Sequence, residues 1–347
     1  MSVTKRHIKI LLLLAAGLLA GCVREDPPTP ETQEEIRLDA SVWQMMQGAP
    51  SRRVSTYESA TFPQNGESFK CFIYNGGATT LYNASEGSLV TWNSSTSKWE
   101  FNDGKHYWPA SDALDFFAYM PTTIPSYITD MSDVASRVTY EAQNPQFKCT
   151  LPMKYESAYT DKESVAHDAD GQTDDMKEFV YALKTGRTKA LDGTNGVELS
   201  FAHPFARIKF QLAASHPDIT INRITFKGLK SGGSCSFNGT TSTWSSLTPS
   251  GDVTTDFVMT LHGTEATFNS NPASPRQIGP DILMVPQTFA GDIEVNATWI
   301  DWGEPYPHNI STKISSQTWA AGTSYTYTFT ITETDLWVDI AKFTEQW

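Results

Sequence analysis

Apolar and polar residues alternate with a two-residue period in many short stretches of this chain, and no long window shows helical periodicity. The regular stretches include Ile36–Trp43, Phe69–Ile73 and Tyr325–Ile331, the last with threonines at every other position. Alternation of this kind is typical of strands with one buried face. Gly and Pro punctuate the chain between these stretches, so the pattern predicts a mostly β protein.

Further short runs predict additional strands, separated by turn signals such as Asn75-Gly76-Gly77. We expect strands at Leu89–Trp92, Trp99–Phe101, Leu114–Met120, Phe179–Leu183, Ile219–Phe226, Ile282–Val285, Ile293–Trp299 and Leu336–Ile340. Residues 230–280, rich in Ser, Thr, Gly and Pro, are expected to form long loops with short strands. The turn cluster Asp192–Gly196 is interpreted as a domain boundary.

After this boundary the apolar positions keep one phase from Val197 to Phe205 and another from Ile208 to Leu212. A one-residue slip beside Pro204 is expected of a bulge or kink. The pattern therefore predicts one long, bent strand over 197–212.

The N-terminus carries a different pattern: a basic start, then an unbroken apolar run from Ile10 to Ala20. This run is shorter than the roughly twenty residues that a membrane-spanning helix needs, and it suits a secretory signal. Its end, Leu19-Ala20-Gly21-Cys22, resembles the lipobox of bacterial lipoproteins, which implies that Cys22 is acylated and becomes the mature N-terminus. The alternative is an ordinary secreted protein with an incidental cysteine.

The charge balance limits the partners of the chain. Its 26 basic and 39 acidic residues give a formal charge of −13. Residues 1–21 contain three basic residues and no acidic one. Their removal as a signal peptide would leave 23 basic and 39 acidic residues, a formal charge of −16. Such a charge argues against nucleic acid and against electrostatic adhesion to anionic lipid. Attachment to a membrane would therefore depend on acyl chains.

Catalytic and metal-binding motifs are not evident. The seven histidines are scattered; His203, on an apolar face, is expected to be packed and hydrogen-bonded. Asp168-Ala169-Asp170-Gly171 lacks the remaining EF-hand positions and is interpreted as a solvated acidic loop. No P-loop, dinucleotide fingerprint or GxSxG is present, so we expect neither an enzyme nor a cofactor, although paired carboxylates for glycoside hydrolysis have no fixed spacing in sequence.

The cysteines and aromatics leave alternatives open. Three cysteines follow the signal and Cys22: Cys71, Cys149 and Cys235. One interpretation is a Cys71–Cys149 disulfide, since exported proteins carry disulfides; the other is that all three are small unbridged residues. Trp92, Trp99 and Trp244 are interpreted either as sugar-stacking side chains or as core residues, the more common use of Trp.

Several short segments together resemble the fimbrillin family, the lipoprotein pilins of type V pili made by Gram-negative anaerobes of gut and mouth. They are Tyr107–Pro109, Asp115–Pro121, Glu178–Ala182, Leu199–Ile208, Leu283–Gln287 and Trp319–Tyr327. The resemblance covers nearly the whole mature chain. It implies two transthyretin-like β-sandwich domains in tandem, over residues 54–196 and 197–347, after a signal peptide (1–21) and a segment with spacer, first strand and processing loop (22–53).

The resemblance also implies a route of assembly. In such pilins an arginine-specific protease cuts the outer-membrane precursor in the loop behind the first strand, and a strand of another subunit fills the groove. Here the first strand is Ile36–Trp43, and Arg52-Arg53 is the expected cut, unless these are two solvated loop arginines. Leu336, Val338 and Ile340 mark the candidate donor strand, which is alternatively this subunit's own last strand.

The sequence thus predicts a structural or adhesive subunit of a cell-surface fimbrium, lipid-anchored in the outer membrane as a precursor. Its expected partners are other pilus subunits, the protease and a host or bacterial surface receptor, and not nucleic acid. The alternative is a monomeric outer-membrane surface lipoprotein that binds glycans.

Overall fold

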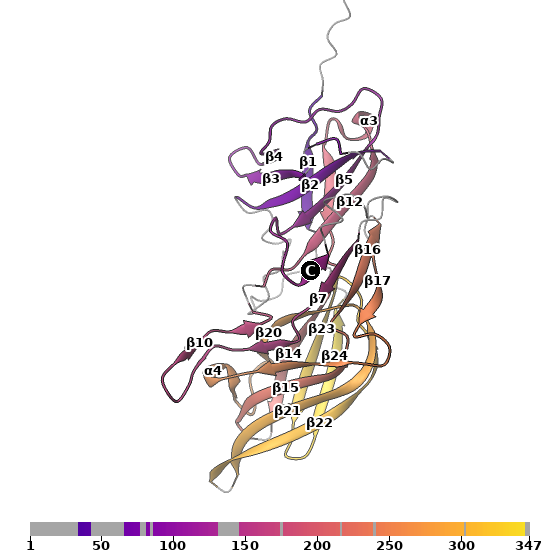
Figure 1. Cartoon of the computed structure of the whole chain (residues 1–347). Helices are drawn as coiled ribbons and strands as arrows, with labels where there is room; N and C mark the ends of the chain where they lie inside the picture. The colour runs from indigo at the N-terminus through magenta and orange to yellow at the C-terminus, as the bar shows by residue number, and fades with distance from the viewer. Residues whose placement is uncertain are drawn as a thin grey trace, which may run out of the picture. The chain divides into compact units, whose positions relative to one another are not determined.

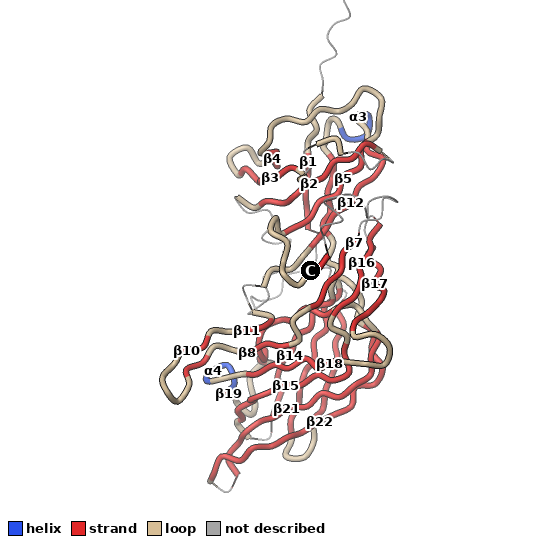
Figure 2. Tube along the Cα trace, in the orientation of Figure 1, coloured by secondary structure: helices blue, strands red, loops and turns tan. Residues whose placement is uncertain are grey.

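Strands dominate the computed structural model (Figures 1 and 2). It describes residues 34–42, 66–76, 81–83, 86–130, 146–173, 176–215, 217–238, 241–301 and 303–343. The helices among them are single turns, α3 (Lys189–Asp192) and α4 (Gly263–Ala266). The prediction of a mostly β fold is confirmed. None of the helices in the described residues is long and apolar enough to cross a membrane.

A five-stranded sheet organises the first part of the chain. Its order is β12 (Val180–Arg187), β5 (Leu114–Met120), β2 (Ser68–Asn75), β3 (Ser88–Asn93) and β4 (Lys98–Phe101). All seven residues of β5 are buried, so the centre of this sheet is covered on both faces. That explains why Leu114–Met120 is apolar at every position except Asp115 instead of alternating.

On one face of this sheet lies a two-stranded parallel sheet of β1 (Leu38–Val42) and β13 (Val197–Phe201) (Figure 1). The apolar side chains between the two sheets form what we call the first-strand core. It contains Ile36, Leu38, Ala40, Phe69, Cys71, Ile73, Val90, Trp99, Trp108, Leu114, Phe116, Ala118, Met120, Val180, Ala182, Val197, Leu199 and Phe201.

The opposite face of the five-stranded sheet contributes to a second cluster, the middle core. This cluster joins Phe72, Phe117 and Tyr119 to side chains of a second, four-stranded sheet. The order of that sheet is β17 (Thr241–Thr248), β16 (Gly232–Asn238), β7 (Gln146–Thr150) and β6 (Ile128–Asp130).

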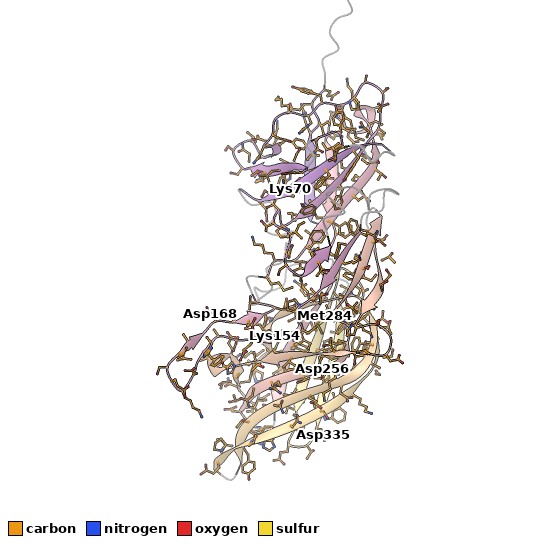
Figure 3. All side chains as sticks on the ribbon, in the orientation of Figure 1. Lys70, Lys154, Asp168, Asp256, Met284 and Asp335 are labelled. Atoms are coloured by element: carbon orange, nitrogen blue, oxygen red, sulfur yellow. The ribbon has the colours of Figure 1, made fainter. Side chains whose placement is uncertain are left out.

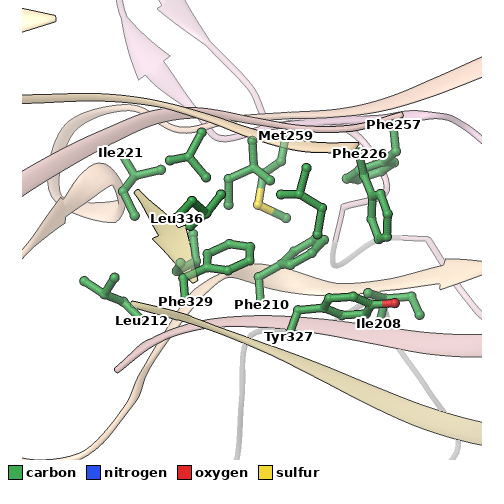
Figure 4. Packing of buried hydrophobic residues seen from close by; sticks show 14 of the residues in the cluster. Ile208, Phe210, Leu212, Ile221, Phe226, Phe257, Met259, Tyr327, Phe329 and Leu336 are labelled. Atoms are coloured by element: carbon green, nitrogen blue, oxygen red, sulfur yellow. The ribbon is translucent and has the colours of Figure 1, made fainter. Parts of the chain in front are cut away.

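Two further sheets enclose the largest cluster, the C-terminal core (Figure 4). One has the order β20 (Arg276–Met284), β14 (Ala206–Ser215), β23 (Thr323–Ile331) and β24 (Leu336–Phe343). The other has the order β11 (Asp170–Gly171), β8 (Lys154–Glu156), β18 (Thr255–Thr260), β15 (Ile219–Leu229), β21 (Thr288–Asp301) and β22 (Glu304–Thr318), with β19 (Thr267–Phe268) also on β15. A small hairpin pairs β9 (Tyr159–Thr160) with β10 (Ala166–His167).

The expectation of one long bent strand over 197–212 is wrong. The segment forms β13 and β14, which belong to different sheets, β13 beside β1 and β14 between β20 and β23. Pro204 cannot donate to a ladder, and the backbone of Ala202 pairs instead with Tyr181. The change of apolar phase therefore marks a passage between sheets rather than a bulge. Residues 230–280 likewise contain more strand than expected, including β16 and β17.

The division at residues 196 and 197 stays a prediction. Three strand pairs cross it, because β1 pairs with β13, β7 with β16 and β8 with β18. Residues 35–347 group as one compact unit by their contacts.

Candidate functional site: the first strand and its groove

The candidate site is the groove that holds β1. Along this groove β1 pairs in parallel with β13 from Leu38 opposite Val197 to Val42 opposite Phe201. The amide of Val197 donates to the carbonyl of Arg37 at 2.8 Å. Close approach of the chains also requires Gly196, whose φ is +88° and whose added Cβ would lie 3.1 Å from the Arg37 carbonyl oxygen.

Alternating side chains of β1 and the residues before it point into the first-strand core, as the sequence predicts. Ile36, Leu38 and Ala40 are 2%, 7% and 5% exposed, whereas Arg37 and Asp39 are exposed. Beneath them Phe69 contacts Trp99 and Phe201, with ring centroids 4.9 and 5.3 Å apart. Burial of Ile36 and Leu38 contributes about 3–6 kcal/mol in total.

The beginning of the groove is closed by the segment after β4. The amide of Ile36 donates to the carbonyl of His106 at 2.8 Å, and Glu35 forms a bridge with Tyr107. Glu35 also pairs with Lys105 at 2.8 Å, and this hydrogen bond raises the pKa of the Lys105 ammonium. The pair is exposed to solvent, so its contribution to stability is small.

Asp103 and Ser88 support this segment. The Ser88 hydroxyl donates to Asp103 at 2.7 Å, and the His106 ring lies 3.1 Å from the same carboxylate. Partial burial alone would raise the pKa of Asp103, but the hydrogen bonds from Ser88 and His106 outweigh it and lower the pKa. The start of β1 is thus anchored by a polar network and its middle by apolar burial.

Cys22 and the Arg52-Arg53 pair lie outside the described residues, so lipidation and cleavage stay predictions. The same holds for Trp43 at the end of the expected first strand. The described part of the first strand is 38–42, inside the range that the alternation predicts.

The candidate donor strand has a place in its own chain. β24 pairs antiparallel with β23, from Leu336 opposite Ile331 to Phe343 opposite Ser324, at the edge of its sheet. Leu336 is 4% exposed and packs in the C-terminal core (Figure 4), with Val338 and Ile340 partly buried against that core. In the isolated chain, β24 is therefore the subunit's own last strand, which was the alternative interpretation. Its donation to a neighbouring subunit stays a prediction.

The conceivable Cys71–Cys149 disulfide is absent. Cys71, Cys149 and Cys235 are all unbridged and buried, Cys71 in the first-strand core and the others in the middle core. Burial raises the pKa of all three thiols, that of Cys149 to about 12. They are small core residues with low reactivity.

The remaining candidates have structural partners. His203 Nδ1 lies 2.9 Å from Glu178 Oε2 with both side chains buried, which confirms the expectation of a packed, hydrogen-bonded ring. Asp170 of the acidic loop pairs with Lys154 of the neighbouring strand; Figure 3 labels Lys154 and Asp168 in this region. Among the described residues, no group of three or more His, Cys, Asp or Glu side chains is arranged to hold a metal ion.

The sequence did not identify the buried partner of His203 or the parallel pairing of β1 with β13. Glu178 lies between Lys177 and the apolar run that begins at Phe179, and desolvation raises its pKa despite His203 and Arg207. Its polar neighbours on the N-terminal side gave no signal that this carboxylate is buried. Nothing local in the sequence indicates which strand β1 joins.

The architecture defines a β-sandwich protein whose first strand is held in a groove by a parallel neighbour and apolar burial. A family model described as Fimbrillin-like matches residues 53–347. The chain therefore belongs to the fimbrillin-like family.

A solved structure shares this fold at low sequence identity. A fimbrial protein from Bacteroides vulgatus superposes with a TM-score of 0.56 at 14% identity, over 89% of this chain and 99% of that one. A proposed cell adhesion protein from Bacteroides ovatus gives a TM-score of 0.49 at 13% identity, over 89% and 96% of the two chains. No curated protein matches the chain.

Proposed function

We propose that this chain is a non-enzymatic structural or adhesive subunit of a cell-surface fimbrium, assembled with other pilus subunits by replacement of its first strand. The single observation that carries the proposal is the groove of β1. Ile36 and Leu38 are buried there as deeply as core residues, although among the described strands β1 pairs with β13 alone. Family membership and the fold shared with a fimbrial protein support the same role.

Delivery precedes assembly in this proposal. Acylation of Cys22 tethers the precursor to the outer membrane, and an arginine-specific protease then cuts at Arg52-Arg53. The family match begins at residue 53, so the part of the chain that the family model matches starts at the proposed cut. One cut there separates lipid and first strand from the remaining subunit, which is then free to enter an extracellular fimbrium.

Loss of the first strand would expose a groove that needs a replacement. Its floor contains Phe69 and Phe201, and β13 would lose the partner of its backbone groups. The lost burial of about 3–6 kcal/mol is comparable with the whole stability of many domains. A strand from a second subunit restores both burial and hydrogen bonds by β-augmentation. We propose β24 as that strand, marked by Leu336, Val338 and Ile340.

The second candidate function is a monomeric outer-membrane surface lipoprotein that binds glycans, or another receptor on a host or bacterial surface. Trp99 is 6% exposed and belongs to the first-strand core, so it offers no stacking face. The indole of Trp244 donates to the carbonyl of Pro204 and packs on Phe147. Trp337, 67% exposed on β24, is the side chain that favours this alternative.

Limited digestion of the chain with an arginine-specific protease tests the proposal. We expect one early cut near Arg53, followed by ladders of subunits on a denaturing gel, because replaced strands are deeply buried. A matched variant, Arg52→Gln with Arg53→Gln, should stay monomeric. Digestion to small fragments, or a clean cut without ladders, would contradict strand replacement, and glycan-array binding by the uncut monomer would favour the alternative.

A further inference from the structure

A cleft of about 630 Å³ lies beside β1 while β1 is still in place. Five consecutive residues, 35–39, form one wall, and residues 97–101 of the β3–β4 hairpin form another. The lining is completed by Trp92, Gly104, Lys105, Thr194 and Asn195. Successive side chains of a strand point to opposite faces, so a cleft that touches only one face is lined by every second residue. A cleft lined by consecutive residues therefore borders the edge of the strand.

Among the described residues, no strand pairs with the edge of β1 that faces away from β13, which we call its open edge. In the parallel ladder Arg37, Asp39 and Ser41 direct their backbone groups to β13, as the bond from Val197 to the Arg37 carbonyl shows. The backbone groups of Leu38 and Ala40 consequently point to the opposite side. On that side the partner of Ile36 is His106, and within the described residues no hydrogen bond to the backbone of Leu38 or Ala40 is found.

The charged lining of the cleft is mixed, with Arg37, Lys98 and Lys105 beside Glu35, Asp39 and Glu100, and its partly exposed aromatic side chains are Trp92 and Phe101. Among the described residues Arg37 and Lys98 form no ion pair within 4 Å, although Lys98 lies close enough to Glu100 for its charge to help lower the pKa of that carboxylate; Glu35 is paired with Lys105. The Glu100 carboxylate already accepts hydrogen bonds from Asn93 and Thr96. The half-buried Trp92 packs edge-on against Trp99, with centroids 5.4 Å apart, which leaves part of its surface available.

We propose that this cleft is a docking site for an extended segment of a second copy of the chain, Leu336–Phe343, which binds before the first strand leaves. The inference rests on the proposed strand replacement and adds its first contact. When the backbone of the second copy's segment pairs with the open edge of β1 at Leu38, the segment is held beside the groove that it fills after β1 leaves. The occupant is thus a short peptide with an acidic and an aromatic residue on one face.

β24 fits this description and is the edge strand of its sheet. Trp337 and Asp339 share its outer face, opposite Thr330 and Thr328 of β23, and Asp335 precedes the strand (Figure 3). Leu336 alone among its described side chains is as buried as a core residue, so release of β24 costs less burial than release of β1. Trp337 would contact Trp92, and Asp339 would pair with Lys98.

A labelled peptide of residues 335–343 tests the docking site by fluorescence anisotropy. The receptor is the unprocessed chain with Arg52→Gln and Arg53→Gln, so that no protease opens the groove. We expect saturable binding that Lys98→Glu weakens about five-fold, as an exposed ion pair predicts. A peptide with Asp339→Lys should restore binding to that variant. Lys313→Glu on the distant strand β22 is the matched control and should bind as the parent does.

Backbone methylation tests the edge pairing. Peptides N-methylated at Val338 or at Asp339 present the blocked nitrogen to opposite sides of the strand, so one of them should lose about ten-fold in affinity and the other little. Equal effects of the two methylations, no effect of Lys98→Glu, or no saturable binding would overturn the docking site.

The two proposals fail separately. Ladders from protease-treated chain, with no peptide binding to the unprocessed chain, would overturn the docking site and leave strand replacement intact. Peptide binding without ladders after a clean cut would support the docking site as a peptide cleft and overturn strand replacement.

Discussion

The substitution Leu38→Ala tests whether β1 is held as a separable strand. Leu38 is 7% exposed and lies in the first-strand core, where truncation of a buried leucine to alanine costs about 2–4 kcal/mol. If β1 opens as a unit while the sheets stay folded, this cost falls on the local opening equilibrium rather than on global unfolding.

Hydrogen exchange of the Val197 amide measures that opening. This amide donates to the carbonyl of Arg37, so it exchanges only when β1 leaves. The expected loss of 2–4 kcal/mol raises its exchange rate about 30- to 700-fold. Amides of β5 and β23 should keep their protection.

Asp39→Ala is the matched control, because Asp39 lies on the same strand with an exposed side chain. Exposed substitutions of this kind usually change stability by less than about 0.5 kcal/mol. An unchanged Val197 amide in Leu38→Ala would refute the local coupling. An equal rise across β5 and β23 would show that β1 cannot leave without unfolding the protein.

Three further predictions concern the cores and one loop. All three described thiols are buried and unbridged. Alkylation at pH 8 of a chain that begins at residue 23 should therefore label no cysteine before unfolding and three cysteines after it. A count of one thiol after unfolding would reveal a disulfide. Burial is the largest influence on Glu178 and raises its pKa above the usual 4.5. The folded state therefore binds the carboxyl proton more tightly than the unfolded state does. As the pH rises above 4.5 this difference lowers the free energy of unfolding. Urea unfolding from pH 4 to 7 should show a flatter profile for Glu178→Gln, and parallel profiles would contradict the assignment. The Lys230 ammonium donates hydrogen bonds to the carbonyls of Pro249 and Gly251 at 2.8 and 2.6 Å. The substitution Lys230→Met should therefore speed proteolysis of the loop around Pro249 and Gly251 without changing hydrogen exchange in β23. Unchanged proteolysis would show that this loop does not depend on Lys230.

The spacing of apolar residues in the sequence identified strands well. The alternating stretch Tyr325–Ile331 lies within β23, and the largely apolar run Leu114–Met120, which does not alternate, matches β5 residue for residue. Side-chain period is a local property, and it reports which face is buried whatever the neighbouring strand is.

Strand partners could not be predicted in the same way. The parallel pairing of β1 with β13 joins residues more than 150 positions apart, and it depends on the shape of the first-strand core rather than on either segment alone. The break at Pro204 shows the same limit: the phase change is visible in the sequence, but a bulge and a passage between sheets give the same pattern.

The candidate site was predictable in its apolar positions and not in its surroundings. Ile36, Leu38 and Ala40 follow from alternation, whereas the cleft beside them requires the position of the β3–β4 hairpin. The open edge at Leu38 is a property of backbone geometry, which side-chain patterns do not report.

The intact mass of the protein recovered from cell-surface fibres tests the central claim most directly, because it reports lipid and cleavage together. The account predicts a chain that begins at residue 53 or 54 and carries no lipid. A mass that corresponds to an acylated chain from Cys22 to Trp347 would contradict removal of the first strand and would leave Cys22 as a permanent anchor.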